Sequence, residues 1–148
     1  SMSNLLQQGL ELSKNKNIHI VSDQELMVRC DVVKIAIVIK NLLDNAEKYA
    51  PSENPVNILY SQNQDIIKIS VKDRGPGISK NIIEKIMLPY VRGENLQKSG
   101  FGLGLSICKR VMGAHNGTIH VINNNKKGAT FTIQWNNKDV GTIENAKK

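Results

Sequence analysis

The sequence predicts an α+β domain in which a mixed, mostly antiparallel sheet is covered on one face by about three helices. Three observations carry this prediction. The chain has 148 residues, of which 40% are hydrophobic and 22% charged, which is enough for one buried core. Two pairs of β-rich segments flank short polar turns, as is typical of hairpins. Segments with helical periodicity precede and separate these pairs.

The N-terminal part of the chain begins with short elements. Residues 4–14 have helical periodicity, and the β-rich segments 17–21 and 27–30 predict two short strands. The turn-prone residues Ser22 and Asp23 separate these strands. We therefore expect one helix and two strands ahead of the long helix that follows.

A long helix is the strongest local prediction. Residues 32–49 contain no glycine or proline and are densely apolar, and Asp31 stands where a helix cap belongs. The many β-branched residues in this segment would also suit a strand, but the segment is longer than a usual strand. Pro51 then ends the helix.

In the rest of the chain, two helices are expected between two hairpins. Each hairpin consists of two β-rich segments around a polar turn, and the glycine-bounded polar stretch 92–100 predicts a mobile segment between the helices. The expected strands are 55–61, 66–73, 118–123 and 129–135. The expected helices are 81–87, which Pro89 ends, and 103–115, which Asn116 and Gly117 close with a left-handed cap.

The domain organisation follows from these elements. We expect residues 1–3 to be a cloning scar, residues 4–135 to form one domain, and the polar residues 136–148 to be a disordered tail. No apolar run reaches the roughly 20 residues of a membrane span, so a cytoplasmic location is expected, whether or not a longer parent protein is anchored in the inner membrane. Cys30 and Cys108 lack any metal-binding spacing and are expected in the core.

The formal net charge of +7 raises the question of nucleic-acid binding. Most of the excess is scattered over the last third of the chain, and no aromatic side chains are interleaved with it as a stacking platform. A solvated surface or a phosphate-facing patch explains the charge better, so we expect no nucleic-acid partner.

The long helix carries an unusual polar stripe. At about 100° per residue, Asn41, Asn45 and Lys48 fall within about 60° of one another, and the strongest apolar positions lie on the other side. Exposed helix positions usually favour better helix formers than asparagine. An amide oxygen suits Mg²⁺ and an ammonium suits a phosphate. The stripe is therefore either a solvated face or a site for a magnesium-bound nucleotide.

Two glycine-rich loops are candidate ligand contacts. The segment 73–78 follows directly on a strand, so Asp73 is held at a strand end, while Gly75 and Gly77 let the backbone approach a ligand. An ordinary turn is the alternative. The segment 100–105 opens a helix, where free N–H groups favour an anion. It lacks the context of a dinucleotide fold and the ending of a Walker loop.

Together these segments resemble the ATP-binding catalytic domain of bacterial sensor histidine kinases, in the GHKL superfamily of gyrase, chaperone, histidine kinase and mismatch-repair ATPases. NLLDNAEKYA (41–50) is similar to the N box, DRGPGI (73–78) to the first glycine box, IMLPYVRG (86–93) to the F box and GFGLGL (100–105) to the second glycine box. Four weak motifs in the family's order make one specific signal. The resemblance covers nearly the whole chain and implies the Bergerat-fold α/β sandwich.

The resemblance implies a set of contacts with ATP and Mg²⁺. Asn45 would ligate Mg²⁺ with help from Asn41. Lys48 would contact phosphate, and Tyr49 would lie against the nucleoside. Asp73 would accept a hydrogen bond from the adenine amino group, because a carboxylate at this strand end suits an exocyclic amine.

The glycine boxes complete the implied site. Gly75 and Gly77 would shape the pocket, and Ile78 would pack on the base. Arg92 would reach the γ-phosphate, and Thr130 would support the adenine end through its hydroxyl. The phosphate lid implied by the second glycine box contains Gly100, Gly102, Leu103, Gly104 and Leu105.

The resemblance also limits the chemistry. In hydrolysing members of the superfamily the position of Asn41 is a Glu that activates water, and an amide cannot act as a base. Asn41, Lys48 and Arg92 would instead hold ATP and keep its γ-phosphoryl for a histidine acceptor. The chain's own histidines, His19, His115 and His120, lack the acceptor context. We expect the acceptor on a separate dimerisation domain.

The implied partners are ATP, this histidine-bearing dimerisation domain and, indirectly, the receiver domain of a response regulator. The isolated domain is expected to be a monomer and the parent protein a homodimer. Two alternatives stay open at this point. One is an anti-sigma-factor type serine kinase, which would normally carry Glu at position 41. The other is a degenerate nucleotide-binding or interaction module.

Overall fold

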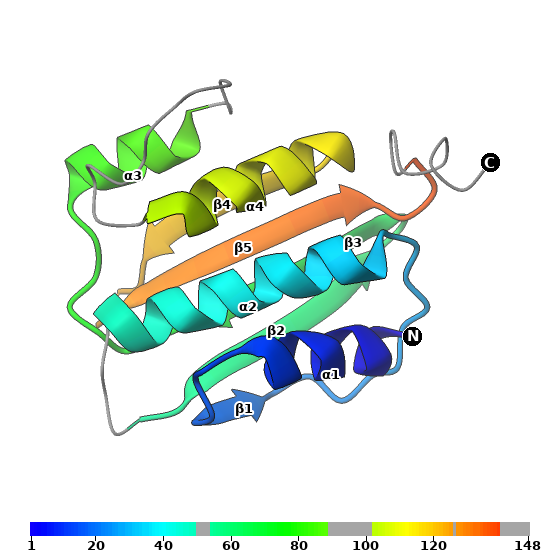
Figure 1. Ribbon diagram of the computed structural model, residues 1–148, viewed down its shortest axis with the longest axis horizontal. Coiled ribbons are helices and arrows are strands. Elements are labelled where there is room, and N and C mark those ends of the chain that lie inside the picture. Colours follow the sequence, from blue (N-terminus) through cyan, green and yellow to red (C-terminus); the bar gives the residue numbers. More distant parts are fainter. Residues whose placement is uncertain (50–53, 89–101, 126, 140–148) are drawn as a thin grey trace.

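The computed structural model describes residues 1–49, 54–88, 102–125 and 127–139, which form an α+β domain (Figure 1). The helices are α1 (Met2–Leu12), α2 (Val32–Tyr49), α3 (Lys80–Met87) and α4 (Gly102–Ala114). The strands are β1 (Ile18–Ile20), β2 (Val56–Asn63), β3 (Ile66–Lys72), β4 (Thr118–Asn123) and β5 (Ala129–Asn136). None of the described helices is long and apolar enough to cross a membrane.

The strands form one sheet in the order β1-β2-β3-β5-β4. β1 and β2 are parallel, and the other neighbours are antiparallel. In Figure 1, α1, α2 and α4 lie over one face of this sheet, and α3 packs against β4. Among the described elements no helix covers the other face, which we call the open face. This arrangement confirms the predicted fold class.

The core lies between the sheet and the three helices. β5 shows this most clearly, because its buried residues alternate with half-buried ones that point to the open face. On α2 the buried residues recur with helical spacing, as predicted. They include Ile35, Ile39, Leu42, Leu43 and Ala46. Cys30 and Cys108 are buried in the same core, which confirms their expected placement.

The bounds of α2 are those that its sequence predicts. Asp31 caps the helix, since its Oδ1 accepts a hydrogen bond from the backbone N–H of Lys34 at 3.1 Å. The C-terminal cap of α4 also agrees with the prediction. Asn116 has a φ of 52°, a left-handed conformation that asparagine tolerates. A Cβ on Gly117 would lie 2.3 Å from the backbone oxygen of Gln134, so only glycine fits there.

The predicted strand at 27–30 is wrong, because these residues form no regular structure. Their backbone groups bind side chains instead of another strand. Asn137 Nδ2 donates to the carbonyl oxygen of Met27 at 2.9 Å, and the N–H of Arg29 donates to Asn137 Oδ1 at 2.5 Å. Trp135 Nε1 donates to the carbonyl oxygen of Arg29 at 2.9 Å. These partners follow more than 100 residues later, so a local pattern does not reveal them.

The helix predicted at 4–14 begins earlier, at Met2. Ser1 Oγ accepts a hydrogen bond from the N–H of Asn4 at 3.2 Å, and Met2 is fully buried. Residues 1–3 therefore take part in the folded domain. After the helix, Asp44 of α2 accepts hydrogen bonds from Ser13 Oγ at 2.8 Å and from the next backbone N–H at 2.9 Å. At the other terminus, β5 runs through Asn136, one residue beyond the predicted boundary.

Candidate functional site

The polar stripe on α2 meets the start of α4 at Asn41. The side-chain amide of Asn41 donates to the carbonyl oxygen of Gly104 at 3.5 Å, and Lys40 Nζ donates to Asn41 Oδ1 at 3.5 Å. Both contacts are at the limit of a hydrogen bond and are weak. A Cβ on Gly104 would lie 3.5 Å from Asn41 Cγ, an ordinary van der Waals contact, so the two residues are adjacent without requiring glycine. Asn41 is thus half-buried but loosely held.

Asn45, one turn further along α2, has an unpaired polar atom. Its Nδ2 is buried and has no hydrogen-bond partner among the described residues. Such a group costs about 1–3 kcal/mol unless a ligand pairs with it. An amide beside an Mg²⁺-bound phosphate would use both ends, with the oxygen on the metal and the N–H on a phosphate oxygen. Asn45 therefore fits the metal and phosphate role that its motif implies.

Asp73, at the end of β3, is held rigidly. Its Oδ1 accepts backbone N–H groups from Gly75 at 2.9 Å and from Ala129 at 3.1 Å, and only 7% of the residue is exposed. Because Val71 is buried on the helix side and side chains alternate along a strand, Asp73 points to that side too. Among the described residues, both donors that reach the carboxylate bind Oδ1, so Oδ2 is available to an exocyclic amine.

The loop after Asp73 is docked on the β4–β5 hairpin. Gly77 has a φ of 82°, and a Cβ there would lie 2.8 Å from Asn123 Oδ1. The Asn123 side chain pairs with both backbone groups of Ile78, each at 2.8 Å. Asn124 Nδ2 donates to the carbonyl oxygen of Asp73 at 3.0 Å. The hairpin thus fixes the position of the acid and of the glycine loop.

Sequence analysis missed the residues that do this. The sequence pattern gives Asn123 only as the end of a strand and 124–128 only as the turn of a hairpin, although Asn123 and Asn124 bind a loop about 50 residues earlier. Gly128 is the clearest case, since its φ is 89° and a Cβ would lie 2.1 Å from the carbonyl oxygen of Asp73. The run of three asparagines before it was the available signal, because asparagine suits such backbone contacts.

Thr130 lies on the opposite face of the sheet from Asp73. Its hydroxyl donates to Asn124 Oδ1 at 2.6 Å, and its register partner on β3 is Lys72, which is exposed on the open face. Asp73 and its donor Ala129 lie on the helix side instead. The Thr130 hydroxyl is linked to the backbone of Asp73 through Asn124, and its support of the adenine end stays a prediction.

The remaining predicted residues are placed only in part. Leu105 is fully buried in α4, and Ile78 is packed against the core. The backbones of Lys48, Tyr49, Gly102 and Leu103 lie in α2 and α4, but their side chains are outside the described part. Arg92, Gly100 and the predicted mobile segment 92–100 are outside the described residues altogether.

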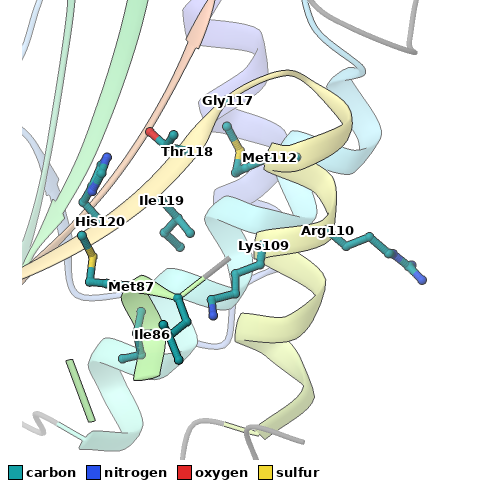
Figure 2. A pocket seen from close by; sticks show the side chains of 11 residues that line it. Ile86, Met87, Lys109, Arg110, Met112, Gly117, Thr118, Ile119 and His120 are labelled. Carbon is teal, nitrogen blue, oxygen red and sulfur yellow. The ribbon is translucent and has the colours of Figure 1, made fainter. Parts of the chain in front are cut away.

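Neither Asn45 nor Asp73 lines the hollow between α3, α4 and β4 or the hollow on the open face. That both residues contact one nucleotide stays a prediction. The first hollow, about 520 Å³ in volume, lies between α3, α4 and β4 and is mainly apolar (Figure 2). Beside it, Lys109 Nζ donates to the carbonyl oxygen of Lys85 at 3.2 Å, which ties α4 to α3.

Two buried groups that contact α2 or its N-terminal cap are not reactive. Burial raises the pKa of Cys108 to about 12, so this residue remains a thiol at neutral pH. His115 is fully buried, with Nδ1 2.8 Å from the carbonyl oxygen of Val111 and Nε2 accepting the N–H of Asp31 at 3.1 Å. Both ring nitrogens are occupied, so His115 connects α4 to the start of α2 and has no free nitrogen for a phosphoryl group.

The sheet is covered by helices on one face, an acid is fixed at a strand end, and the long helix carries amides. Together these features define a nucleotide-binding domain of the Bergerat type. The family described as histidine kinase-, DNA gyrase B- and HSP90-like ATPase matches residues 30–139, and the chain belongs to this family. The resemblance that the motifs suggest is therefore confirmed.

Individual relatives agree with this assignment. The chain is 36% identical over 135 residues to the sensor protein KdpD of Clostridium acetobutylicum, covering 88% of this chain and 15% of that protein. It is 42% identical over 107 residues to the adaptive-response sensory kinase SasA of Synechococcus sp. (strain JA-3-3Ab), covering 70% of this chain and 28% of that protein. The chain thus spans less than a third of either relative.

Solved structures show the same fold. The catalytic domain of the histidine kinase ThkA matches with a TM-score of 0.72 at 28% identity, over 92% of both chains. Full-length ShkA in complex with AMPPNP matches with a TM-score of 0.70 at 25% identity, over 91% of this chain and 30% of that one. Both neighbours cover nearly all of the chain described here.

Proposed function

We propose that this chain is the catalytic domain of a sensor histidine kinase, which binds ATP with Mg²⁺ and presents the γ-phosphoryl group to a histidine on a separate dimerisation domain. The observation that carries the proposal is the buried Nδ2 of Asn45, which has no hydrogen-bond partner among the described residues and lies on the helix that bears the N box of this ATPase family. That unpaired amide needs a polar ligand, and Mg²⁺-bound phosphate is the ligand that suits it.

Adenine is selected at the other end of the site. The fixed carboxylate of Asp73 offers Oδ2 to the adenine amino group, and Gly75, Gly77 and Ile78 form the wall against the base. Guanine carries an oxygen where adenine carries this amine, so it would place an acceptor against the carboxylate. The site therefore favours ATP over GTP.

The phosphate end favours transfer over hydrolysis. Asn41 offers an amide, which cannot deprotonate water, so bound ATP is kept for another acceptor. Lys48 and Arg92 supply positive charge to the phosphates, Tyr49 contacts the nucleoside, and the lid glycines supply N–H groups at the start of α4. Mg²⁺, when bound, neutralises the developing charge.

The proposed phosphoryl transfer implies two protein partners. The acceptor is a histidine on the dimerisation domain of a homodimeric parent protein, and a response regulator receives the phosphoryl group afterwards. Nothing in the described residues or the relatives favours a serine kinase or a degenerate binding module.

Calorimetric titration of ATP and GTP, with and without Mg²⁺, tests this function. We expect ATP to bind at least about tenfold more tightly than GTP, and Mg²⁺ to strengthen ATP binding. Asn45→Ala should abolish the effect of Mg²⁺ while the melting temperature stays within a few degrees, since no hydrogen bond of Nδ2 is lost. Asn63→Ala, an exposed amide at the far end of β2, is the matched control. Equal binding of both nucleotides with no effect of Mg²⁺ would contradict the proposal.

A further inference from the structure

The second hollow lies on the open face of the sheet, and of the residues named above its lining includes Arg74 of the first glycine box and Thr130. It has a volume of about 790 Å³, in the range of small-molecule sites. A row of register partners across four strands forms its floor. The row consists of Asn57, Lys72, Thr130 and Ile122. The rim is completed by Asn54, Arg74, Asn123, Asn124, Asn125 and Lys127.

The lining of this hollow is positively charged. Lys72, Arg74 and Lys127 are exposed on it, and none of the described residues that line it is acidic. The other polar members are a threonine and asparagines, whose side-chain amides can donate hydrogen bonds to an anion. Three cations and several amide donors around one concave surface are suited to binding phosphate groups.

Asn57 supplies an independent sign of a ligand. Its Oδ1 is buried and accepts no hydrogen bond from any described residue, although the side chain lies on the floor of the hollow. As assigned, the unpaired atom is an acceptor, and a turned amide would place the donor Nδ2 there instead. If Nδ2 takes the buried position, it can donate to an oxygen of an anion in the hollow. A buried polar atom without a partner is unusual in a folded protein and calls for one.

We propose that this hollow binds a small soluble compound that carries a diphosphate or longer phosphate chain. The cations neutralise the charge, and the Asn57 amide pairs with one phosphate oxygen. The site is separate from the nucleotide site proposed above, because Asp73 and α2 lie on the helix side of the sheet and Lys72 and Thr130 on the open face.

The two sites share two residues, which would link them. Asn123 and Asn124 line the hollow, and the same side chains bind the backbone of Ile78 and Asp73 in the glycine loop. A ligand that draws either asparagine toward the hollow would alter the loop that carries Asp73. Occupancy of the hollow should therefore change ATP affinity.

Titration with inorganic pyrophosphate without Mg²⁺, followed by amide chemical shifts, tests the site. The largest shifts are expected at Asn57, Lys72 and Thr130. Lys72→Gln and Arg74→Gln should each weaken binding by about fivefold, the scale of one exposed ion pair. Asn57→Ala should weaken it by about threefold without lowering the melting temperature, because no hydrogen bond of Oδ1 is lost.

Lys68→Gln is the matched control, because Lys68 is exposed on the same strand and face but does not line the hollow. It should leave the affinity for pyrophosphate unchanged. Equal losses for Lys68→Gln and Lys72→Gln, or shifts confined to the loop 73–78, would overturn the proposal. So would binding of phosphatidylglycerol vesicles in the absence of pyrophosphate binding, which would indicate a lipid surface. Asn45→Ala should retain pyrophosphate binding, so this test is separate from that of the kinase function.

Discussion

At the scale of single residues, the candidate nucleotide site depends on how firmly each polar side chain is held. Asp73 is fixed by two backbone N–H groups, whereas Asn41 forms hydrogen bonds of 3.5 Å with Lys40 and Gly104, and Asn45 Nδ2 has no partner among the described residues. A rigid acceptor suits a flat base whose position does not change during the reaction. Loosely held amides suit a metal and phosphates that rearrange as the γ-phosphoryl group leaves.

Asp73→Asn tests the base-reading role. The asparagine oxygen can keep the bonds from Gly75 and Ala129, but its NH₂ would face the adenine amino group, donor against donor. We expect ATP affinity to fall by about tenfold or more, and the preference for ATP over GTP to disappear. Calorimetry with both nucleotides measures this. An unchanged ratio of the two affinities would show that Asp73 does not contact the base.

At the scale of elements, Asp44 joins the end of α1 to α2. Burial opposes ionisation of this carboxyl, but hydrogen bonds from Ser13, the Lys14 backbone and Lys40 outweigh it and hold the pKa of Asp44 below its ordinary value. A lowered pKa in the folded state means that ionised Asp44 stabilises the fold above pH of about 4, and that this contribution is lost as the pH falls further.

Asp44→Asn should therefore lower the free energy of unfolding by about 1 kcal/mol at pH 7 and reduce the loss of stability between about pH 5 and pH 3. Urea unfolding at several pH values measures both effects. Asp65→Asn is the control, because Asp65 forms only an exposed ion pair with Lys138. If both variants lose stability equally, the junction between α1 and α2 does not depend on Asp44.

Gly128 determines how the β4–β5 hairpin meets the loop after Asp73. Gly128→Ala would place a Cβ 2.1 Å from a backbone oxygen at a φ of 89°, so we expect a loss of about 2 kcal/mol or more and weaker ATP binding. Gly113→Ala, inside α4 with nothing within 4 Å, should instead stabilise by up to about 1 kcal/mol. Thermal unfolding compares the two, and equal effects would contradict this account of the loop.

The parts of the fold that sequence predicts are those with local periodicity. The long helix and both hairpins repeat their apolar residues over many positions, and Asn41 and Asn45 follow from the same helical spacing. Local periodicity does not predict the conformation of 27–30 or the hydrogen bonds of Asn123 and Asn124 to the loop after Asp73. The partners in these contacts are 45 to 110 residues apart in the sequence. The role of Thr130 is predicted from the family resemblance alone, whereas the alternation of side chains along β5 places Thr130 on the open face.

At the scale of the whole molecule, the sheet separates two faces with different tasks. The helix side carries the candidate ATP site, and the open face carries the basic hollow, with the β4–β5 hairpin in contact with both. Since the chain spans less than a third of its relatives KdpD and SasA, it holds the ATP-binding part of the proposed reaction. Under the proposed function, the acceptor histidine belongs to another domain.

This division predicts the behaviour of the isolated chain. Incubated with Mg²⁺ and radiolabelled ATP, it should bind the nucleotide but incorporate no acid-labile phosphate, because His115 has both ring nitrogens occupied and His19 and His120 lack the acceptor context. Adding the histidine-bearing dimerisation domain of the parent protein should yield phosphohistidine on that domain alone. The Asn45→Ala variant should fail in this transfer, whereas Asn63→Ala should not. Label on the isolated chain would show that the acceptor lies within these 148 residues and would contradict transfer to a second domain.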